Sequence, residues 1–136
     1  MRTSRRSATI AVTAAVVATL GVGPASAEGG FSASISAWLP GKDSRQWTDN
    51  NRDNDPTTVG FAGCSVDTGR FIYAGLQLKL NRASLPDPVL ARDDNHCNVT
   101  SFGDRSAGTY YFHYSNLNGA TGVAAHLTVN TVVVKY

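Results

Sequence analysis

The chain has 136 residues, in which 12 Lys and Arg residues outnumber 10 Asp and Glu residues. Three of the cations precede residue 28, so the 109 residues from there on carry nine cations, ten acids and a net charge of −1. This balance lacks the basic footprint that phosphate backbones require, and it argues against nucleic acid as a partner. These 109 residues are enough for one domain around one hydrophobic core.

Residues 1–27 have the layout of a cleaved export signal. Three arginines are followed by an uncharged apolar run over residues 8–22 and by an A-x-A cleavage pattern at residues 25–27. The run is too short to span a bilayer, so we expect no membrane span in the mature chain. The leader resembles those of exported proteins from high-GC Gram-positive bacteria. We therefore expect residues 28–136 to be secreted, by the general secretory or the twin-arginine route.

Strict alternation of polar and apolar residues predicts a strand over residues 31–38. In this strand Ile35 shares one face with the apolar residues, whereas Trp38 falls on the face of the serines. Further along the chain we expect strands over residues 46–48, 57–64, 70–81, 99–102, 109–115 and 123–136.

Turns and loops are expected between these strands, at residues 39–43, 49–56 and 118–119, where turn-forming residues gather. Residues 81–95 contain two prolines and are predicted to be an irregular crossing. The last strand changes its apolar phase near residues 130–131, which predicts a β-bulge there.

This pattern predicts an all-β fold, a single small antiparallel β-sandwich or barrel with one disulfide. The acidic residues agree, because the mature chain has nine Asp, which favour turns, and only one Glu. Cys64 and Cys97 are the two cysteines, and thiols in an exported domain most often pair. The alternatives are two free thiols or a metal site, and no metal-ligand spacing supports the latter.

An acidic loop is the strongest local signal for a bound ion. Asp49, Asn51, Asp53 and Asp55 stand at alternate positions, which is an oxygen-ligand spacing that suits calcium. The loop lacks the glycine and glutamate of an EF-hand, so the prediction is a looser structural calcium site. The alternative is a solvated turn. No other cofactor is expected.

Four aromatic residues are candidates for ligand binding: Trp38, Trp47, Tyr73 and Tyr111. Several of them fall on the polar phase of their strands, where exposure is expected. Exposed rings on a sheet form flat apolar platforms that suit sugar rings or a partner protein. The alternative is that each ring closes a corner of the core.

Catalytic residues are scarce in this chain. His96, His113 and His126 match no compact metal or catalytic spacing, although the last two could meet across a sheet. No serine-nucleophile motif is present, and a glycosidase would have to draw both carboxylates from Asp. We therefore do not expect an enzyme.

These observations predict a small, monomeric, non-catalytic binding domain whose extracellular ligand is a polysaccharide or cell-wall glycan. The alternative is a secreted protein inhibitor of extracellular hydrolases, with residues 85–89 as the contact loop, since its prolines pre-order an extended segment. A third interpretation is a self-associating surface protein, if the apolar residues 131–134 lie on a sheet edge.

Overall fold

The computed structural model describes residues 28–136, so the expected export signal lies outside the described residues. In this part of the chain there are nine strands, and no helix that could cross a membrane was found. The strands are β1 (Gly30–Trp38), β2 (Lys42–Asp43), β3 (Trp47–Asp49), β4 (Thr58–Val66), β5 (Ala74–Leu80), β6 (Val89–Asn95), β7 (Val99–Ser101), β8 (Gly108–Leu117) and β9 (Leu127–Lys135).

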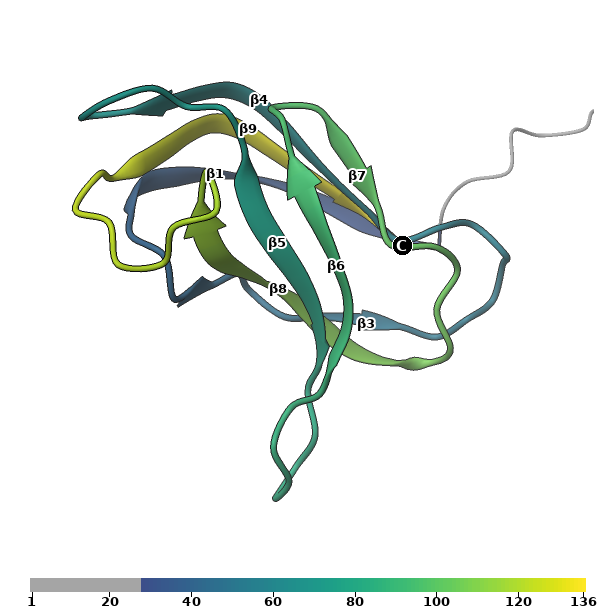
Figure 1. The fold of residues 1–136 in the computed structure, drawn as a ribbon. Coiled ribbons are helices and arrows are strands. Elements are labelled where there is room, and N and C mark those ends of the chain that lie inside the picture. Colours follow the sequence, from purple (N-terminus) through teal and green to yellow (C-terminus); the bar gives the residue numbers. More distant parts are fainter. Residues whose placement is uncertain (1–27) are drawn as a thin grey trace, which may run out of the picture.

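The strands form two antiparallel sheets that pack face to face (Figure 1). One sheet has the order β1-β9-β4-β7, and the other has the order β2-β8-β5-β6, with β3 also paired to β8. The two sheets do not close into a barrel. This confirms the predicted all-β antiparallel fold, in its sandwich form.

The core lies between the inner faces of the two sheets, where inward-pointing side chains of both sheets meet. Its largest fully buried residues on β8 are Tyr110, Phe112 and Tyr114, and on β5 they are Leu76 and Leu78. The facing sheet contributes Val59 and Phe61 of β4 together with Leu127, Val129, Val132 and Val134 of β9.

The predicted bulge in the last strand is confirmed. The register between β1 and β9 shifts between the pairs Ala33–Val132 and Ile35–Val129, so the two residues in between let β9 keep both apolar phases inside. β9 lies between β1 and β4 rather than on an edge. The edge position that a self-associating surface at residues 131–134 required is therefore absent.

A second shift in β1 changes the position of Trp38. The register shifts again between Ile35 and Trp38, and Ala37 adopts a φ of 51°. This slip moves the following side chain to the other face of the strand. Trp38 is therefore half-buried against Phe112, with ring centroids 6.4 Å apart, and not on the outer serine face as strict alternation predicted.

The strand expected over residues 70–81 begins later, at Ala74. The side chain of Asn118 forms hydrogen bonds with the backbone of the residues just before Ala74. Its Oδ1 accepts the N–H groups of Ile72 and Tyr73 at 2.9 and 3.0 Å, and its Nδ2 donates to the carbonyl of Arg70 at 2.7 Å. Side-chain partners of this kind compete with a strand ladder.

The irregular crossing expected over residues 81–95 is wrong in its second half. Residues 89–95 form β6, which pairs with β5 in a long hairpin. Only the tip, residues 81–88, lacks strand structure, and it projects beyond both sheets at the bottom of Figure 1. The two prolines lie within this tip, where no ladder hydrogen bond is required of them.

The predicted disulfide is confirmed. Cys64 of β4 is bonded to Cys97 in the turn between β6 and β7, with a Cα–Cα distance of 5.9 Å. The turn is organised by Asn95, which is completely buried. Its Oδ1 accepts the N–H groups of Cys97 and Asn98, and its Nδ2 lies within hydrogen-bond distance of acceptors on Val59, Asn98 and Thr100.

Candidate functional site

Two of the four candidate aromatic residues are buried, so the expectation that they are exposed is wrong. Trp47 is 3% exposed and lies between the rings of Phe31 and Tyr136, each 6.0 Å away. Tyr111 is 7% exposed, although it points away from the core, because the hairpin tip folds back and places Asp87 on its hydroxyl at 2.8 Å. Neither ring offers a flat face to a ligand.

The other two candidates are half-buried and lie apart. Tyr73 packs against His96, with ring centroids 5.4 Å apart, and its N–H donates to Asn118 Oδ1. Trp38 lies at the end of β1 and lines a cavity. The four rings therefore form no common platform, and Trp38 is the one of the four that lines this cavity.

This cavity lies between β1 and the connection from β2 to β3, and its volume is about 200 Å³. Phe31, Trp38 and Phe112 form its aromatic walls, and Ile35 and Val132 form an aliphatic floor. The floor residues are 2% and 1% exposed, which shows that the cavity reaches down to the core.

Small side chains in β1 leave the space open. Ala33 and Ser34 line the cavity at positions where a larger side chain would occupy it. Ala33 lies on the inward phase of β1, between Phe31 and Ile35, so a leucine there would extend into the space. The local sequence feature that leaves room for the cavity is thus a small residue, Ala33, between two large apolar residues on the same face of β1.

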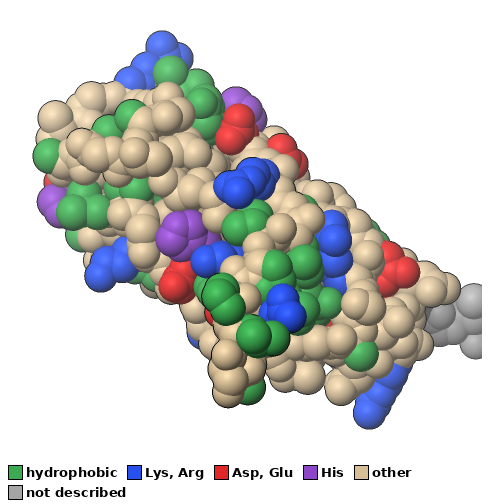
Figure 2. Space-filling view, turned by 60° about the horizontal axis from the view of Figure 1, so that its bottom comes forward, with side chains coloured by type: hydrophobic (Ala, Val, Ile, Leu, Met, Phe, Trp, Pro, Cys, Tyr) green, Lys and Arg blue, Asp and Glu red, His purple; other side chains and the backbone are tan. Residues whose placement is uncertain are grey.

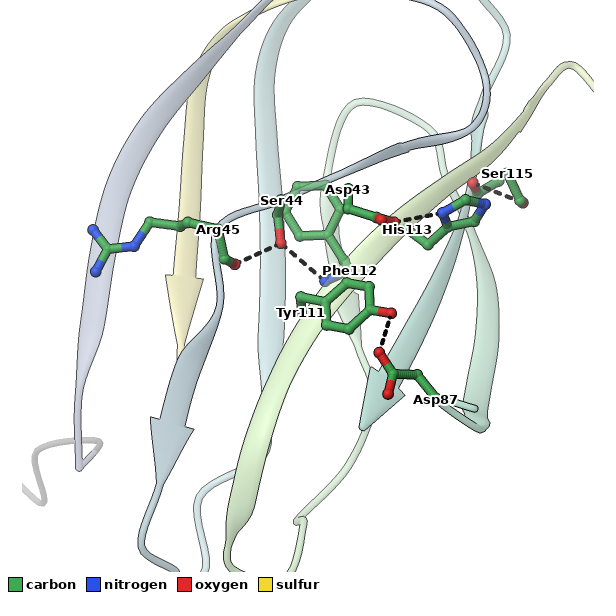
Figure 3. A network of polar contacts seen from close by, with 9 residues as sticks. Asp43, Ser44, Arg45, Asp87, Tyr111, Phe112, His113 and Ser115 are labelled. Carbon is green, nitrogen blue, oxygen red and sulfur yellow. Dashed lines mark hydrogen bonds and ion pairs between the residues drawn. The ribbon is translucent and has the colours of Figure 1, made fainter. Parts of the chain in front are cut away.

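The rim of the cavity carries polar groups from the connection between β2 and β3. Ser44 is fixed to β8, since its N–H donates to the Phe112 carbonyl at 2.9 Å and its Oγ accepts the Phe112 N–H at 3.0 Å. The same Oγ donates to the carbonyl of Arg45 at 2.8 Å. These contacts direct the Arg45 side chain toward β1, as Figure 3 shows, where its guanidinium lies 4.4 Å from the centroid of the Phe31 ring.

Arg45 is exposed and forms no ion pair within residues 28–136. Its charge is therefore available to a ligand at the mouth of an apolar cavity. On the side of the molecule drawn in Figure 2, where the hairpin tip comes forward, hydrophobic side chains gather beside Lys and Arg side chains. An apolar cavity with a few convergent polar groups is the usual form of a small-ligand site.

The histidines do not meet. His113 Nδ1 lies 2.6 Å from Asp43 on the outer face of the second sheet, and His126 Nδ1 lies 2.7 Å from Asp67 at the β4 end. His96 Nδ1 lies 3.2 Å from the carbonyl of Ile72. Among the described residues, no hydroxyl or thiol group is hydrogen-bonded to any of these rings. The described residues thus offer two carboxylate–imidazole pairs, His113 with Asp43 and His126 with Asp67.

The acidic loop is closed by hydrogen bonds to its own backbone. Asp49 and Asp53 each accept the N–H group two residues on, from Asn51 at 2.7 Å and Asp55 at 3.0 Å. Burial raises the pKa of the Asp49 carboxyl. Over residues 28–136, no group of three or more His, Cys, Asp and Glu side chains is placed to hold a metal ion. The calcium site stays a prediction from the residue spacing.

Glu28 crosses the same loop and was not expected to have a role there. Its carboxylate oxygens accept the N–H groups of Asn50 and Arg52 at 2.9 and 2.8 Å. The bond from Arg52 is the main reason why the pKa of Glu28 lies below its ordinary value. The first residue of the predicted mature chain is thus attached to the loop.

Comparisons with known proteins add no relative to this description of the cavity: no protein-family model, no curated protein and no solved structure matches the chain.

Proposed function

We propose that the protein is a secreted, non-catalytic binding domain whose extracellular ligand places an apolar group in the cavity beside Trp38 and an anionic group on Arg45. The observation that carries this proposal is that the two features lie side by side. An apolar cavity of about 200 Å³ has at its rim the guanidinium of Arg45, which forms no ion pair with any described residue. The disulfide between β4 and the β6–β7 turn is compatible with an oxidising compartment.

The size and lining of the cavity favour one ring or one large side chain as its occupant. An engineered apolar cavity of about 150 Å³ in another protein takes up benzene, so about 200 Å³ admits a group of that kind. The walls are mostly hydrocarbon, and burying sugar hydroxyls there would leave them without partners. A glycan that stacks on Trp38 is therefore the competing ligand.

The probe for this site is phenylacetate, which combines an aromatic ring with a carboxylate. Titration into the purified protein is expected to shift the amide NMR signals of β1 and of residues 44–45. Trp38→Ala is expected to abolish these shifts, since it removes a wall of the cavity. Arg45→Gln is expected to weaken binding about tenfold, because a hydrogen bond to a charged group is lost.

Two comparisons make the test specific. Arg70→Gln removes an exposed guanidinium that does not line the cavity and should leave the phenylacetate affinity unchanged. Co-sedimentation with insoluble peptidoglycan, chitin and cellulose tests the glycan arm. Sedimentation that depends on Trp38, without any phenylacetate shift, would assign the site to a glycan. No response to either kind of probe would contradict a ligand site at this cavity.

The hairpin tip favours a second candidate function, inhibition of a secreted hydrolase. Asp87 braces the tip from within. Its Oδ1 accepts the N–H group of Arg82 and its Oδ2 accepts the hydroxyl of Tyr111, both at 2.8 Å. Leu85, which lies within the braced segment 82–87, is 56% exposed. A loop held in one conformation loses less entropy on binding, which suits insertion into a cleft.

The brace is expected to weaken in acid. The bond from the Arg82 N–H, followed by that from Tyr111, holds the pKa of Asp87 below its ordinary value of 3.8. Because folding lowers the pKa of Asp87, the stability that its carboxylate contributes to the tip is complete above pH 3.8. This stability is lost as the pH falls through the pKa of Asp87 in the folded protein. Amide exchange at Arg82 should therefore accelerate below this pH relative to the intrinsic rate, and Asp87→Ala should give the same effect at neutral pH.

Asp104→Ala is the control, since Asp104 is exposed and accepts no hydrogen bond within the described residues. If exchange at Arg82 is as slow in Asp87→Ala as in Asp104→Ala, the tip is not held by the carboxylate. The functional arm is inhibition of a panel of secreted proteases and glycosidases. Inhibition that is lost in Leu85→Ala would favour this candidate, and no inhibition across the panel counts against it.

A further inference from the structure

We infer that β1 accepts an extended polypeptide segment as an additional strand of its sheet, with one side chain of that segment in the cavity. This inference rests on the proposed function, because it names the class of ligand that the cavity takes. Three features of the described residues support it: the character of the β1 edge, the direction of its free backbone groups, and the position of the cavity and Arg45 beside that edge.

The edge of β1 lacks the protection that the other edges have. β1 is nine residues long, ends its sheet, and contains neither a charged residue nor a proline. β7, at the opposite edge of that sheet, has three residues, and β2 has two. β6 is long, but it carries Arg92, Asp93 and Asp94, which are exposed. Edges of natural sheets are usually shortened or charged in this way to prevent pairing with another strand.

The register shows which backbone groups of β1 point to the free edge. Gly29 and Tyr136 exchange both of their backbone hydrogen bonds, at 2.6 and 3.0 Å. Bonded and non-bonded pairs alternate along an antiparallel ladder. Ser32, paired with Val133 in the same register, is therefore in a non-bonded pair. Its N–H and C=O point away from β9, where an incoming strand would meet them.

The cavity lies where the side chains of such a strand would project. Alternate residues of an added strand point to the same face as Phe31, Ala33 and Ile35, which is the face that lines the cavity. One of these side chains would enter the cavity, and the next on the same face would lie near Arg45. The expected ligand is an extended segment with an aromatic or large apolar residue and an acidic residue two positions apart. Main-chain bonds would supply affinity and the cavity would supply specificity.

The probe is a blocked hexapeptide of threonines with a phenylalanine and a glutamate two positions apart. Its affinity for the purified protein is measured by calorimetry, beside two versions that are N-methylated at every second backbone nitrogen, one in each phase. In an added strand one phase faces β1 and the other faces solvent. We expect one N-methylated peptide to bind like the parent and the other to bind about tenfold or more weakly.

Matched variants of the protein test the same edge. Ser32→Pro removes the outward N–H without a charge change and should weaken the parent peptide about tenfold, because proline is tolerated on an edge but cannot donate. Ser32→Thr keeps the N–H and should bind the peptide like the wild type. Phenylacetate should bind both variants equally, since it needs the cavity alone.

Equal binding by the two N-methylated peptides, or no binding of the hexapeptide to a protein that binds phenylacetate, would overturn strand addition and leave the cavity site standing. Absence of phenylacetate binding would instead count against the proposed function. The N-methylated pair is measured on the wild-type protein, so the inference is decided even if Ser32→Pro does not fold.

Discussion

Replacement of Cys64 and Cys97 by serine is expected to lower the free energy of unfolding by about 3 to 4 kcal/mol, because the bond closes a long loop in the unfolded chain. The two residues are 33 positions apart. The bond also attaches the β6–β7 turn, where the chain passes from one sheet to the other, to β4. Urea denaturation of the double variant and of the oxidised wild type measures the difference.

Reduction of the wild-type protein provides an independent check on this value. It should give a loss similar to that of the double variant, since both remove the same constraint. Ser65→Ala, next to Cys64 and exposed, should unfold like the wild type. A loss below about 1 kcal/mol would contradict the chain-entropy argument and would indicate that the turn is held by other contacts.

Asn95→Ala is expected to cost about 3 kcal/mol, because it leaves several backbone groups of the β6–β7 turn without partners at once. The Asn95 amide accepts the N–H groups of Cys97 and Asn98, at 2.9 and 3.2 Å. It also lies 3.0 Å from the buried Thr100 hydroxyl. Thermal and urea unfolding of the variant measure the loss.

Asn54→Ala is the matched control, since Asn54 is exposed and its side chain makes no hydrogen bond within the described residues. Asn95 and the disulfide hold the same turn, in which Cys97 has a φ of 63°. Their effects should therefore not be additive, and the triple variant should lose less than the sum of the separate losses. Full additivity would show that Asn95 acts independently of the disulfide turn.

The strands that alternate regularly could be predicted from the sequence, whereas interruptions of that alternation could not. Val59 and Phe61 of β4 and the phase change at residues 130–131 of β9 were visible as apolar periods. The slip at Ala37 was not, because a bulge with a positive φ at an alanine has no sequence signal of its own. That slip decides where Trp38 lies.

The candidate site depended on contacts between distant segments, and these were harder to predict. Tyr111 has the outward phase that exposure requires, but the hairpin tip covers it through Asp87, 24 residues away. Arg45 was not singled out, because an arginine between two short strands resembles any solvated residue. Its role is visible only when β1 lies beside it. The one local signal was Ala33, a small residue on the inward face of an apolar strand.

The strand order of the β1 sheet has a consequence for the time at which this protein can fold. β9, the last strand of the chain, lies between β1 and β4, and so the first strand has no partner in its sheet until residues 127–135 are present. Most contacts join residues far apart in sequence, which is the topology of slow folding. The β1 sheet therefore stays incomplete until residues 127–135 have been synthesised. For the secreted protein that we propose, this connectivity delays the pairing of β1, which favours passage through a channel that admits only unfolded chains.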